Sequence, residues 1–450
     1  MENLNLYNTL SRAIEPILPT DGKTIRLYTC GPTVYNYVHI GNLRSYITAD
    51  LLYRTLIYDG YEVDYVMNIT DVDDKTINAT IAEFGPSANV ENLHEYTSRY
   101  LDLFKKDLDA VNIDAKNIRM IRVSEVIPQI QEFILRLIDK GYAYHTDDGV
   151  YFSIEKYQAD FHDYGALVGE KFLEGKKIGA RVAVDEYDKD NLSDFALWKS
   201  HTENDAQIFW DHEVLGKGRP GWHIECSVIN KVGFGDNAID IHTGGVDLIF
   251  PHHTNEIAQS QPLGPFVKHW MHAEHLNVAD EKMAKSKKNF YTLRDLEEKG
   301  FTGLDLRYYF LNTHYKKQMN FIEQGMKSSK DALRRMRIDA QQPDKLPEVI
   351  RENPEHNFIL DINNDLNAPR ALGDAWVNSN NLIDYDRILG LRLGEKESFE
   401  TPEEVQTLLN QRQQAREAKD FKKSDELRDE IAKLGFEVKD TGNGQQLSKI

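Results

Sequence analysis

The sequence predicts an α/β protein built on a doubly wound parallel sheet, interrupted by an inserted domain and followed by an all-helical region and a small C-terminal module. Three observations predict this class. The chain has 450 residues, about three times the ~150 residues typical of one domain, so several domains are expected. A strand–helix–strand pattern lies near the N-terminus, and helical periodicity dominates from Leu304 onward.

The strand–helix–strand pattern defines the first part of the sheet. Residues 24–30 alternate apolar and polar side chains and run into a Gly-Pro pair, which predicts a strand followed by a loop. Apolar side chains recur every four residues over 42–58, which predicts a helix, and 61–69 read as the next strand. Such a unit implies a parallel, Rossmann-like sheet, whose ligands lie beyond the carboxyl ends of its strands.

The middle of the chain has the pattern of an insertion. A helical pattern over 124–140 is followed by a hairpin pattern over 142–154, centred on an Asp-Asp-Gly turn. Residues 171–190 are rich in glycine and charge, which is typical of exposed loops. Core character returns at 195–198 and 221–226.

Composition limits the classes of protein that the chain can belong to. With 40% hydrophobic and 28% charged residues, it is typical of a globular protein rather than a disordered or fibrous one. The net charge of -19 argues against an even coat of nucleic acid but allows a local basic surface. No run approaches the roughly 18 apolar residues of a membrane span, and the N-terminus lacks a signal core. We therefore expect a cytoplasmic protein with no membrane partner.

Two short motifs have chemistry suited to a polyphosphate. The first, residues 39–42 (HIGN), stands at a predicted helix start, where backbone N–H groups and the helix dipole favour phosphate. The second, residues 282–288 (KMAKSKK), places four lysines beside a serine hydroxyl. A lysine run is more often a solvated surface, so either motif alone is weak. Together, with the first on a strand-to-helix loop, they favour a nucleotide site.

The two cysteines form a candidate metal site with residues far along the chain. Cys30 ends the first strand, and Cys226 lies upstream of His252 and Glu256. On a helix His252 and Glu256 would share a face, whereas His253 would point about 100° away. Two thiolates, an imidazole and a carboxylate suit zinc. The alternative is two buried apolar cysteines and a surface His–Glu pair.

Longer segments resemble the cysteinyl-tRNA synthetase family of class I aminoacyl-tRNA synthetases. The family signatures, usually written HIGH and KMSKS, correspond to the two phosphate motifs. Asn42 replaces the last histidine of the first, Ala284 replaces the first serine of the second, and the tail ends in an atypical GNGQQLSKI. The matching segments, in chain order, are LYTCGPTVYNYVHIGNLRS, NITDVDDKTI, FALWK, GRPGWHIECS, DIHTGGVDLIFPHHTNEIAQS, KMAKSKKNF, DINNDLNAPRAL and REAKDFKKSDELRDEIAKLGFEVKD.

The resemblance implies a domain order along the chain. It comprises the two halves of a Rossmann catalytic domain at 1–120 and 217–275 with a connective insertion at 121–216 between them, a stem-contact region with the KMSKS-like loop at 276–325, a helical bundle at 326–393 and an anticodon-binding module at 403–450.

The resemblance also implies ligands and roles for particular residues. One zinc per chain would be held by Cys30, Cys226, His252 and Glu256, and would bind the thiolate of the substrate cysteine. Thr70, Trp222 and His242 would line the cysteine pocket. ATP, with Mg²⁺, would contact His39, Asn42, Gly244, Gly245, Asp247 and Lys285, and the catalytic residues would be His39, Lys282 and Lys285.

The implied activity is that of a ligase whose partners are L-cysteine, ATP and tRNA(Cys). Cysteine is activated to cysteinyl-adenylate and transferred to the terminal adenosine of the tRNA, and we expect a monomer. Seven basic and two acidic residues over 313–337 suit the acceptor arm, although a solvated helix face is the alternative.

Two other interpretations stay open. One is a synthetase-like ligase that joins cysteine to an amino sugar, but such enzymes lack the anticodon-binding module that the tail from Arg416 resembles. The other is a non-catalytic paralogue that binds RNA or a protein partner. The presence of His39, Lys282, Lys285 and the whole candidate zinc set argues against it.

Overall fold

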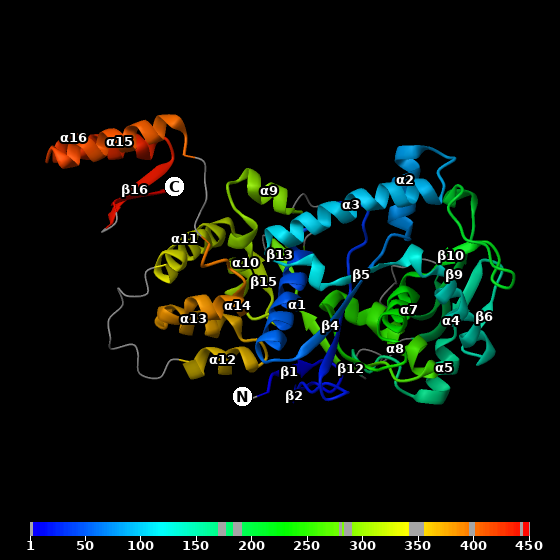
Figure 1. Cartoon of the computed structure of the whole chain (residues 1–450). Coiled ribbons are helices and arrows are strands. Elements are labelled where there is room, and N and C mark those ends of the chain that lie inside the picture. The colour runs from blue at the N-terminus through cyan, green and yellow to red at the C-terminus, as the bar shows by residue number, and fades with distance from the viewer. Residues whose placement is uncertain are drawn as a thin grey trace. The chain divides into compact units, whose positions relative to one another are not determined.

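The computed structural model shows two compact units, residues 1–393 and 394–450 (Figure 1). None of the helices in the described part of the chain has the length and apolar character that crossing a membrane requires. The residues that the structure describes are 3–169, 177–182, 191–278, 281–282, 290–341, 355–395, 401–441 and 444–449.

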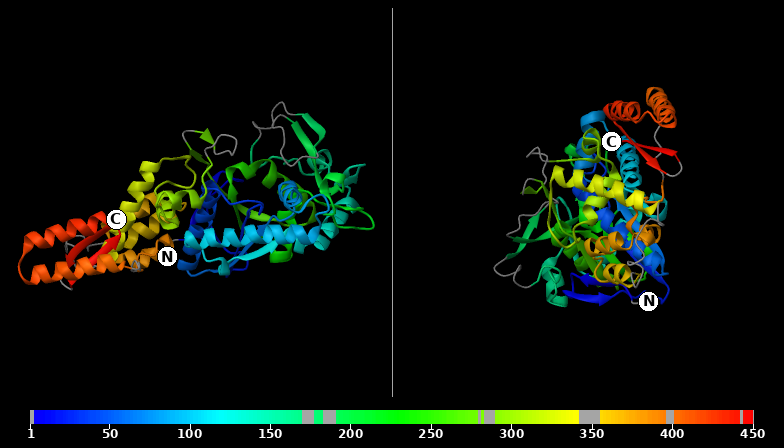
Figure 2. Two further views of the ribbon diagram at one scale, coloured as in Figure 1. Left: turned by 90° about the horizontal axis from the view of Figure 1, so that it is seen from above. Right: turned by 90° about the vertical axis from the view of Figure 1, so that its left-hand side faces the viewer.

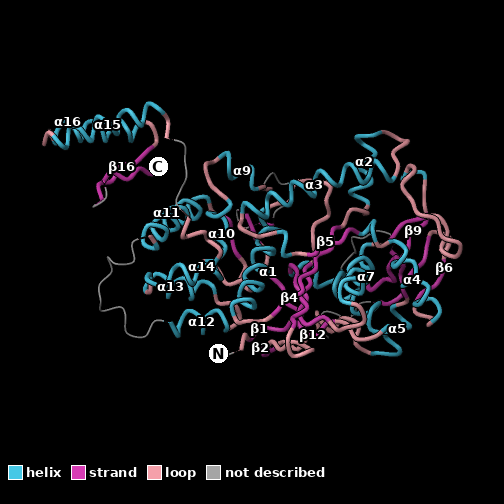
Figure 3. Tube along the Cα trace, in the orientation of Figure 1, coloured by secondary structure: helices cyan, strands magenta, loops and turns pink. Residues whose placement is uncertain are grey.

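A five-stranded, wholly parallel sheet is the framework of the first unit (Figure 3). The chain enters it at β3 and adds strands on both sides, so the sheet is doubly wound and the predicted fold class is confirmed. Helix α1 (Ile40–Tyr58) joins β3 to β4, as the apolar periodicity predicts. In spatial order the strands are β12 (Val267–Ala273), β11 (Ile239–Gly245), β3 (Thr24–Thr29), β4 (Glu62–Ile69) and β5 (Arg119–Arg122).

The insertion contains a second sheet. Helix α4 (Ile127–Asp139) and the β6–β7 hairpin agree with the predicted helix and hairpin. The prediction of loops over 171–190 is wrong in part, because β8 (Lys177–Val182) pairs in parallel with β9. Backbone hydrogen bonds to β9 hold this strand within a segment that is rich in glycine and charge. The remaining strands are β6 (Ala143–His145), β7 (Gly149–Phe152), β9 (Asn191–Ser200) and β10 (Gly218–Pro220), and α5 (Ile154–Phe161) follows β7.

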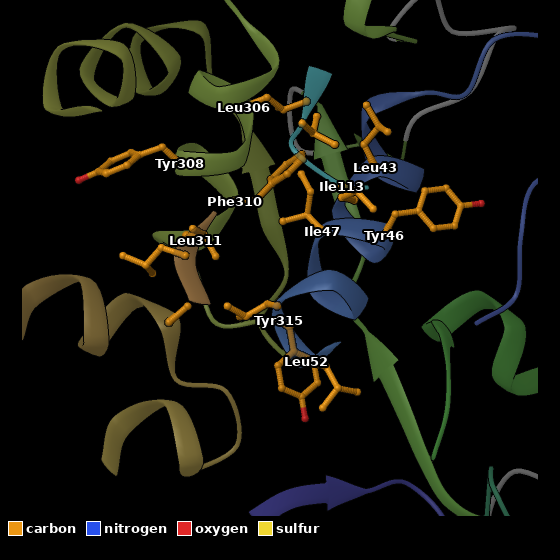
Figure 4. Close-up of a cluster of buried hydrophobic side chains, with 14 of the residues drawn as sticks. Leu43, Tyr46, Ile47, Leu52, Ile113, Leu306, Tyr308, Phe310, Leu311 and Tyr315 are labelled. Atoms are coloured by element: carbon orange, nitrogen blue, oxygen red, sulfur yellow. The ribbon is translucent and has the colours of Figure 1, made fainter. Parts of the chain in front are cut away.

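Helix α1 also provides the contact between the sheet and the helical region. Leu43 and Ile47 on α1 belong to one buried cluster with Leu306 and Phe310 on α10 (Gly303–Leu311) (Figure 4). The long helix α3 (Val90–Ala110) contacts α10 and also α2 (Asp74–Phe84) (Figure 2). The parallel sheet and the helical region therefore form one unit.

The other elements of the first unit are shorter. Three strands form a small sheet in the order β14 (Glu281–Lys282), β13 (Leu276–Val278) and β15 (Met319–Phe321), and an N-terminal hairpin pairs β1 (Asn5–Asn8) with β2 (Ala13–Pro16). The helices are α7 (Trp222–Phe234), α8 (Thr254–Ser260), α9 (Leu293–Glu298), α11 (Glu323–Ala340), α12 (Glu355–Asn363), α13 (Ala368–Val377) and α14 (Leu382–Leu389).

The second unit has its own small core. Helices α15 (Glu403–Glu417) and α16 (Phe421–Lys433) precede the antiparallel strands β16 (Phe436–Thr441) and β17 (Gly444–Lys449). The helical pattern predicted from Leu304 onward therefore does not extend to these strands, and the atypical tail contains all of β17. The domain boundaries predicted inside the first unit stay predictions. The buried apolar residues of the second unit are Val405, Leu409, Ile431, Phe436 and Val438.

Candidate active site and metal centre

A cleft of about 320 Å³ lies at the carboxyl ends of β3 and β11. The loop after β3 and the start of α1 form one side of it, and the end of β11 forms the other. Among its lining residues are five of those predicted for ATP and two from the predicted zinc and cysteine sites, so one cleft reaches both. These are His39, Asn42, Gly244, Gly245, Asp247, Cys30 and Trp222.

His39 caps the first turn of α1 with its side chain. The backbone N–H of Asn42 donates to His39 Nδ1 at 3.1 Å. Because Nδ1 accepts, the proton of the neutral ring belongs on Nε2. The ring of Phe290 contacts the imidazole edge-on at 5.3 Å between centroids and so restricts its rotation. His39 can therefore present an N–H donor together with the positive end of the helix dipole.

The two glycines at the end of β11 are needed for close packing. A Cβ at Gly244 would lie 2.7 Å from Cε1 of His253, and one at Gly245 would lie 2.5 Å from Oδ1 of Asp247. Any side chain there would displace the imidazole or the carboxylate. The absence of side chains at these two positions therefore keeps the cleft open and leaves room for Asp247, which also lines it.

Most of the lysine motif falls outside the described residues, including Lys285. The backbone of Lys282 is described, and it pairs with Asn277 of β13. After the motif, the backbone N–H of Ile40 donates to the carbonyl of Tyr291 at 2.9 Å, beside the cleft-lining Phe290. This hydrogen bond connects the segment that follows the lysine motif to the start of α1.

The structure brings together all four predicted metal ligands. Cys30 follows β3, Cys226 lies on α7, and Glu256 lies on α8. The two Sγ atoms are 3.8 Å apart, and His252 Nε2 lies 3.3 Å from Cys226 Sγ and 3.2 Å from Glu256 Oε1. All four are buried, and their ligand atoms lie within 4.8 Å of one another.

His253 also reaches this cluster, although helical spacing placed it on another face. Its Nε2 lies 3.3 Å from Cys30 Sγ and 3.9 Å from Glu256 Oε1. The reason is local, because residues 249–253 form a π-helical turn in which Phe250 has non-helical angles of φ -137° and ψ 131°. Pro251 was the sequence signal that a regular helix does not begin here.

A second possible ligand set shares two residues with the first. It consists of Cys30, His242, His253 and Glu256, and His242 Nε2 lies 3.1 Å from Glu256 Oε2. His253 Nδ1 in turn contacts Nε2 of His272 at 2.7 Å. Among the described residues, Glu256 is therefore shared by two histidine-containing arrangements, a feature that the sequence pattern did not predict.

The electrostatics of the cluster favour a bound cation. Burial raises the pKa values of the Cys30 thiol and the Glu256 carboxyl, and lowers those of the His242 and His253 imidazoles. Two thiolates and a carboxylate would place three negative charges where water cannot solvate them. A divalent cation would offset these charges, so the donor set fits a zinc ion.

The residues predicted for the cysteine pocket occupy different depths. Trp222 lines the cleft and stacks on His252, with ring centroids 4.3 Å apart. Thr70 is buried, and its hydroxyl donates to Glu225 at 2.8 Å. His242 is also buried, 4.4 Å from the ring of Trp270. Of the three, Trp222 alone borders the cleft, so the roles of Thr70 and His242 stay predictions.

Not all of the basic side chains over 313–337 are free to contact RNA. Lys316 contacts Asp365 at 2.7 Å and lies over the ring of Tyr7 at 3.8 Å. Lys327 is exposed, 3.5 Å from Glu323. Part of the predicted acceptor-arm track is therefore engaged in contacts within the protein.

Comparison with known proteins defines the class first. Residues 16–331 match the family model described as the class I (C) tRNA synthetase catalytic domain. The fold resembles Mycobacterium tuberculosis methionyl-tRNA synthetase in complex with methionyl-adenylate, at TM-score 0.55 and 12% identity over 87% of this chain and 84% of that one. A ternary complex of Agrobacterium radiobacter K84 agnB2 LeuRS gives TM-score 0.55 and 12% identity over 85% and 86%. The catalytic unit has the class I synthetase fold.

The relatives then define the family. The cysteine–tRNA ligase of Chlamydia muridarum is 42% identical over an alignment 491 positions long, which covers 100% of both chains. That of Protochlamydia amoebophila is 42% identical over 481 positions, which cover 99% of this chain and 98% of that one. Residues 399–447 match the family model of the cysteinyl-tRNA ligase anticodon-binding domain. The chain belongs to the cysteine–tRNA ligase family, which confirms the family predicted from the motifs.

Proposed function

We propose that this protein activates L-cysteine with ATP and transfers it to the terminal adenosine of tRNA(Cys). The observation that carries this function is the single cleft in which His39, Cys30 and Trp222 meet, in a chain related to cysteine–tRNA ligases over its whole length. Cysteine and ATP can therefore bind side by side. The cytoplasmic location and monomeric state expected from the sequence stay predictions.

In the first step, a carboxylate oxygen of cysteine attacks the α-phosphorus of ATP, and the bond to pyrophosphate breaks as the new P–O bond forms. The protein positions the reactants and stabilises charge on the phosphates. His39 donates from Nε2 beside the N-terminus of α1, and Lys282 and Lys285 supply positive charge. Asn42, Gly244, Gly245 and Asp247 form the nucleotide side of the cleft, and Mg²⁺ arrives with ATP.

Cys30, Cys226, His252 and Glu256 would hold one zinc ion next to the cysteine side chain. When bound, zinc would act as a Lewis acid that stabilises a thiolate. A serine hydroxyl is a harder and much less acidic group than a thiol, so this site offers a basis for rejecting serine without a separate editing reaction. Trp222 closes the pocket beside His252.

The proposed function is tested by cysteine-dependent ATP–pyrophosphate exchange, followed by charging of a tRNA(Cys) transcript. We expect both reactions with cysteine and neither with serine. Exchange without charging of tRNA would favour the amino-sugar ligase, and absence of both would favour the non-catalytic paralogue. The match of residues 399–447 to an anticodon-binding domain already disfavours the amino-sugar ligase.

Removal of the second unit should separate tRNA binding from adenylate formation. A chain that ends at Glu395 keeps the cleft and every predicted zinc ligand, and loses only a unit with its own core. Cysteine-dependent exchange should stay near the level of the full chain. The KM for tRNA should rise roughly tenfold or more, equivalent to about 1.4 kcal/mol of lost binding energy.

The comparison uses initial rates of both reactions, with the full chain as control. Within the second unit, Arg412 on α15 donates to Asp440 on β16 at 2.8 Å and so joins the helices to the strands. Arg412→Ala in the full chain should therefore reproduce the charging defect without a truncation. Equal charging efficiency of the full and shortened chains would show that this unit does not read the anticodon.

A further inference from the structure

Helix α7 carries Trp222 and Cys226. The segment that follows β4 contacts α7 and also β10, the strand that precedes α7. Thr70, just after β4, donates to Glu225 on α7. Four residues later, Asp74 opens α2 and makes ion pairs with the insertion. The same short segment of the catalytic domain thus contacts α7 directly and also contacts the strand that leads into it.

The carboxylate of Asp74 pairs with two cations from neighbouring strands of the insertion. Lys199 Nζ on β9 lies 3.1 Å from Asp74 Oδ2, and the guanidinium of Arg219 on β10 donates to Oδ1. Arg219 Nε also contacts Asp205 at 3.2 Å. The side chains of Lys199 and Arg219 are only 11% and 8% exposed, whereas that of Asp74 is 39% exposed, so the two cations are largely shielded from water and the carboxylate is partly open to it.

The charges around Asp74 are matched to its ionised form. Burial by itself would raise the pKa of Asp74, but the charges of Arg219 and Lys199 outweigh burial and hold this pKa below its usual value. At neutral pH the carboxylate is therefore ionised. Without it, Lys199 and Arg219 would each lose an ion pair in a position that is largely shielded from water.

Arg219 is linked to the active site by a short and regular path. Arg219 lies opposite Lys199, and Pro220 opposite Trp198, in the antiparallel β10–β9 pair. The next residue, Gly221, donates its backbone N–H to Leu197 at 2.9 Å, and a Cβ at Gly221 would lie 2.0 Å from the carbonyl oxygen of Ala196. The backbone therefore has little freedom between Arg219 and Trp222.

We propose that Asp74 is a positioning residue for the cysteine pocket, acting through Arg219 and β10 to hold Trp222 and Cys226 in place. This inference rests on the proposed function of the cleft. Asp74 does not line the cleft itself; it borders a separate cavity of about 660 Å³ between α2 and the insertion sheet. Its effect on catalysis is therefore indirect, and should fall on cysteine more than on ATP, because the nucleotide side of the cleft is built from α1 and β11.

The test is Asp74→Asn in the full chain, which keeps the size of the side chain and removes its charge. In the exchange reaction we expect the KM for cysteine to rise roughly tenfold, the scale of a small misplacement of binding groups, while the KM for ATP changes by less than about twofold. Asp74→Glu should restore most of the loss. In zinc-loaded protein, release of zinc to a chelator should be faster for Asp74→Asn than for the wild type.

Glu203→Gln is the matched control, because Glu203 is an exposed carboxylate that lines the same cavity. It should change neither KM nor the rate of zinc release. An unchanged KM for cysteine in Asp74→Asn, or equal changes in both KM values together with a lowered melting temperature, would overturn the positioning role. If the wild type shows no exchange, the proposed function fails, and the zinc-release comparison alone then decides the role of Asp74.

Discussion

Replacing Cys226 by serine should remove the metal and nearly all cysteine activation. Cys226 Sγ lies 3.8 Å from Cys30 Sγ and 3.3 Å from His252 Nε2, at the centre of the ligand set. A serine hydroxyl is a hard donor and is not ionised at neutral pH, so it would not replace the thiolate. Because loss of outer-shell partners alone costs about 10- to 100-fold, exchange should fall by at least about 10²-fold.

Elemental analysis of the purified variant, together with exchange kinetics, measures both effects. The binding of ATP is the internal control, because residues of α1 and the end of β11 form the nucleotide side of the cleft and none of them changes. Glu256→Gln provides a second variant in the same cluster and should also weaken metal retention. A fully active Cys226→Ser protein, or active wild-type protein that contains no metal, would reject the zinc site.

Replacing His39 by asparagine should slow adenylate formation while leaving the fold nearly intact. Asparagine is a good N-cap, so its side chain can still accept the backbone N–H of Asn42. It cannot supply the second ring nitrogen that donates toward the phosphates. By analogy with the loss of one charge-stabilising donor, kcat for exchange should fall roughly 10²- to 10³-fold.

His39→Ala is the partner variant, because it removes both the donor and the cap. It should lose activity to a similar degree and in addition lose about 1 kcal/mol of stability, the usual cost of an N-cap. Thermal unfolding and exchange kinetics of the two variants separate these contributions. If His39→Asn retains full exchange activity, the imidazole acts only as a helix cap.

Local patterns predicted most elements around the site. The predicted strand, helix and strand over 24–69 agree with β3, α1 and β4 within two residues at each end. The agreement is good because apolar periodicity, and the glycines that follow the first strand and the helix, are signals carried by neighbouring residues alone. The β8 strand was missed for the opposite reason. Its alternating apolar residues cover only six positions within a segment rich in glycine and charge, and its pairing with β9 supplies the backbone hydrogen bonds.

The candidate site was predicted in part. Spacing and the family resemblance named Cys30, Cys226, His252 and Glu256, which the fold brings together. The participation of His253 was not predicted, because helical spacing does not apply to the π-helical turn around Pro251. The contacts of His242 with Glu256 and of His253 with His272 join residues of different elements, and no local pattern encodes such pairs.

The sequence by itself determined the family and the class of fold, and predicted which residues could bind phosphate and a soft metal, because these depend on residue type and on short-range spacing. Only the tertiary structure decided that the phosphate motif and Cys30 line one cleft, that Glu256 contacts three histidines, and that Asp74 pairs with residues of the insertion. The physical reason is that burial and charge pairing act between segments far apart in the chain. Cys30 follows β3 and Cys226 lies on α7, and the fold places their Sγ atoms 3.8 Å apart. The free-energy cost of burying a charge on Cys30 depends on all the groups packed around it.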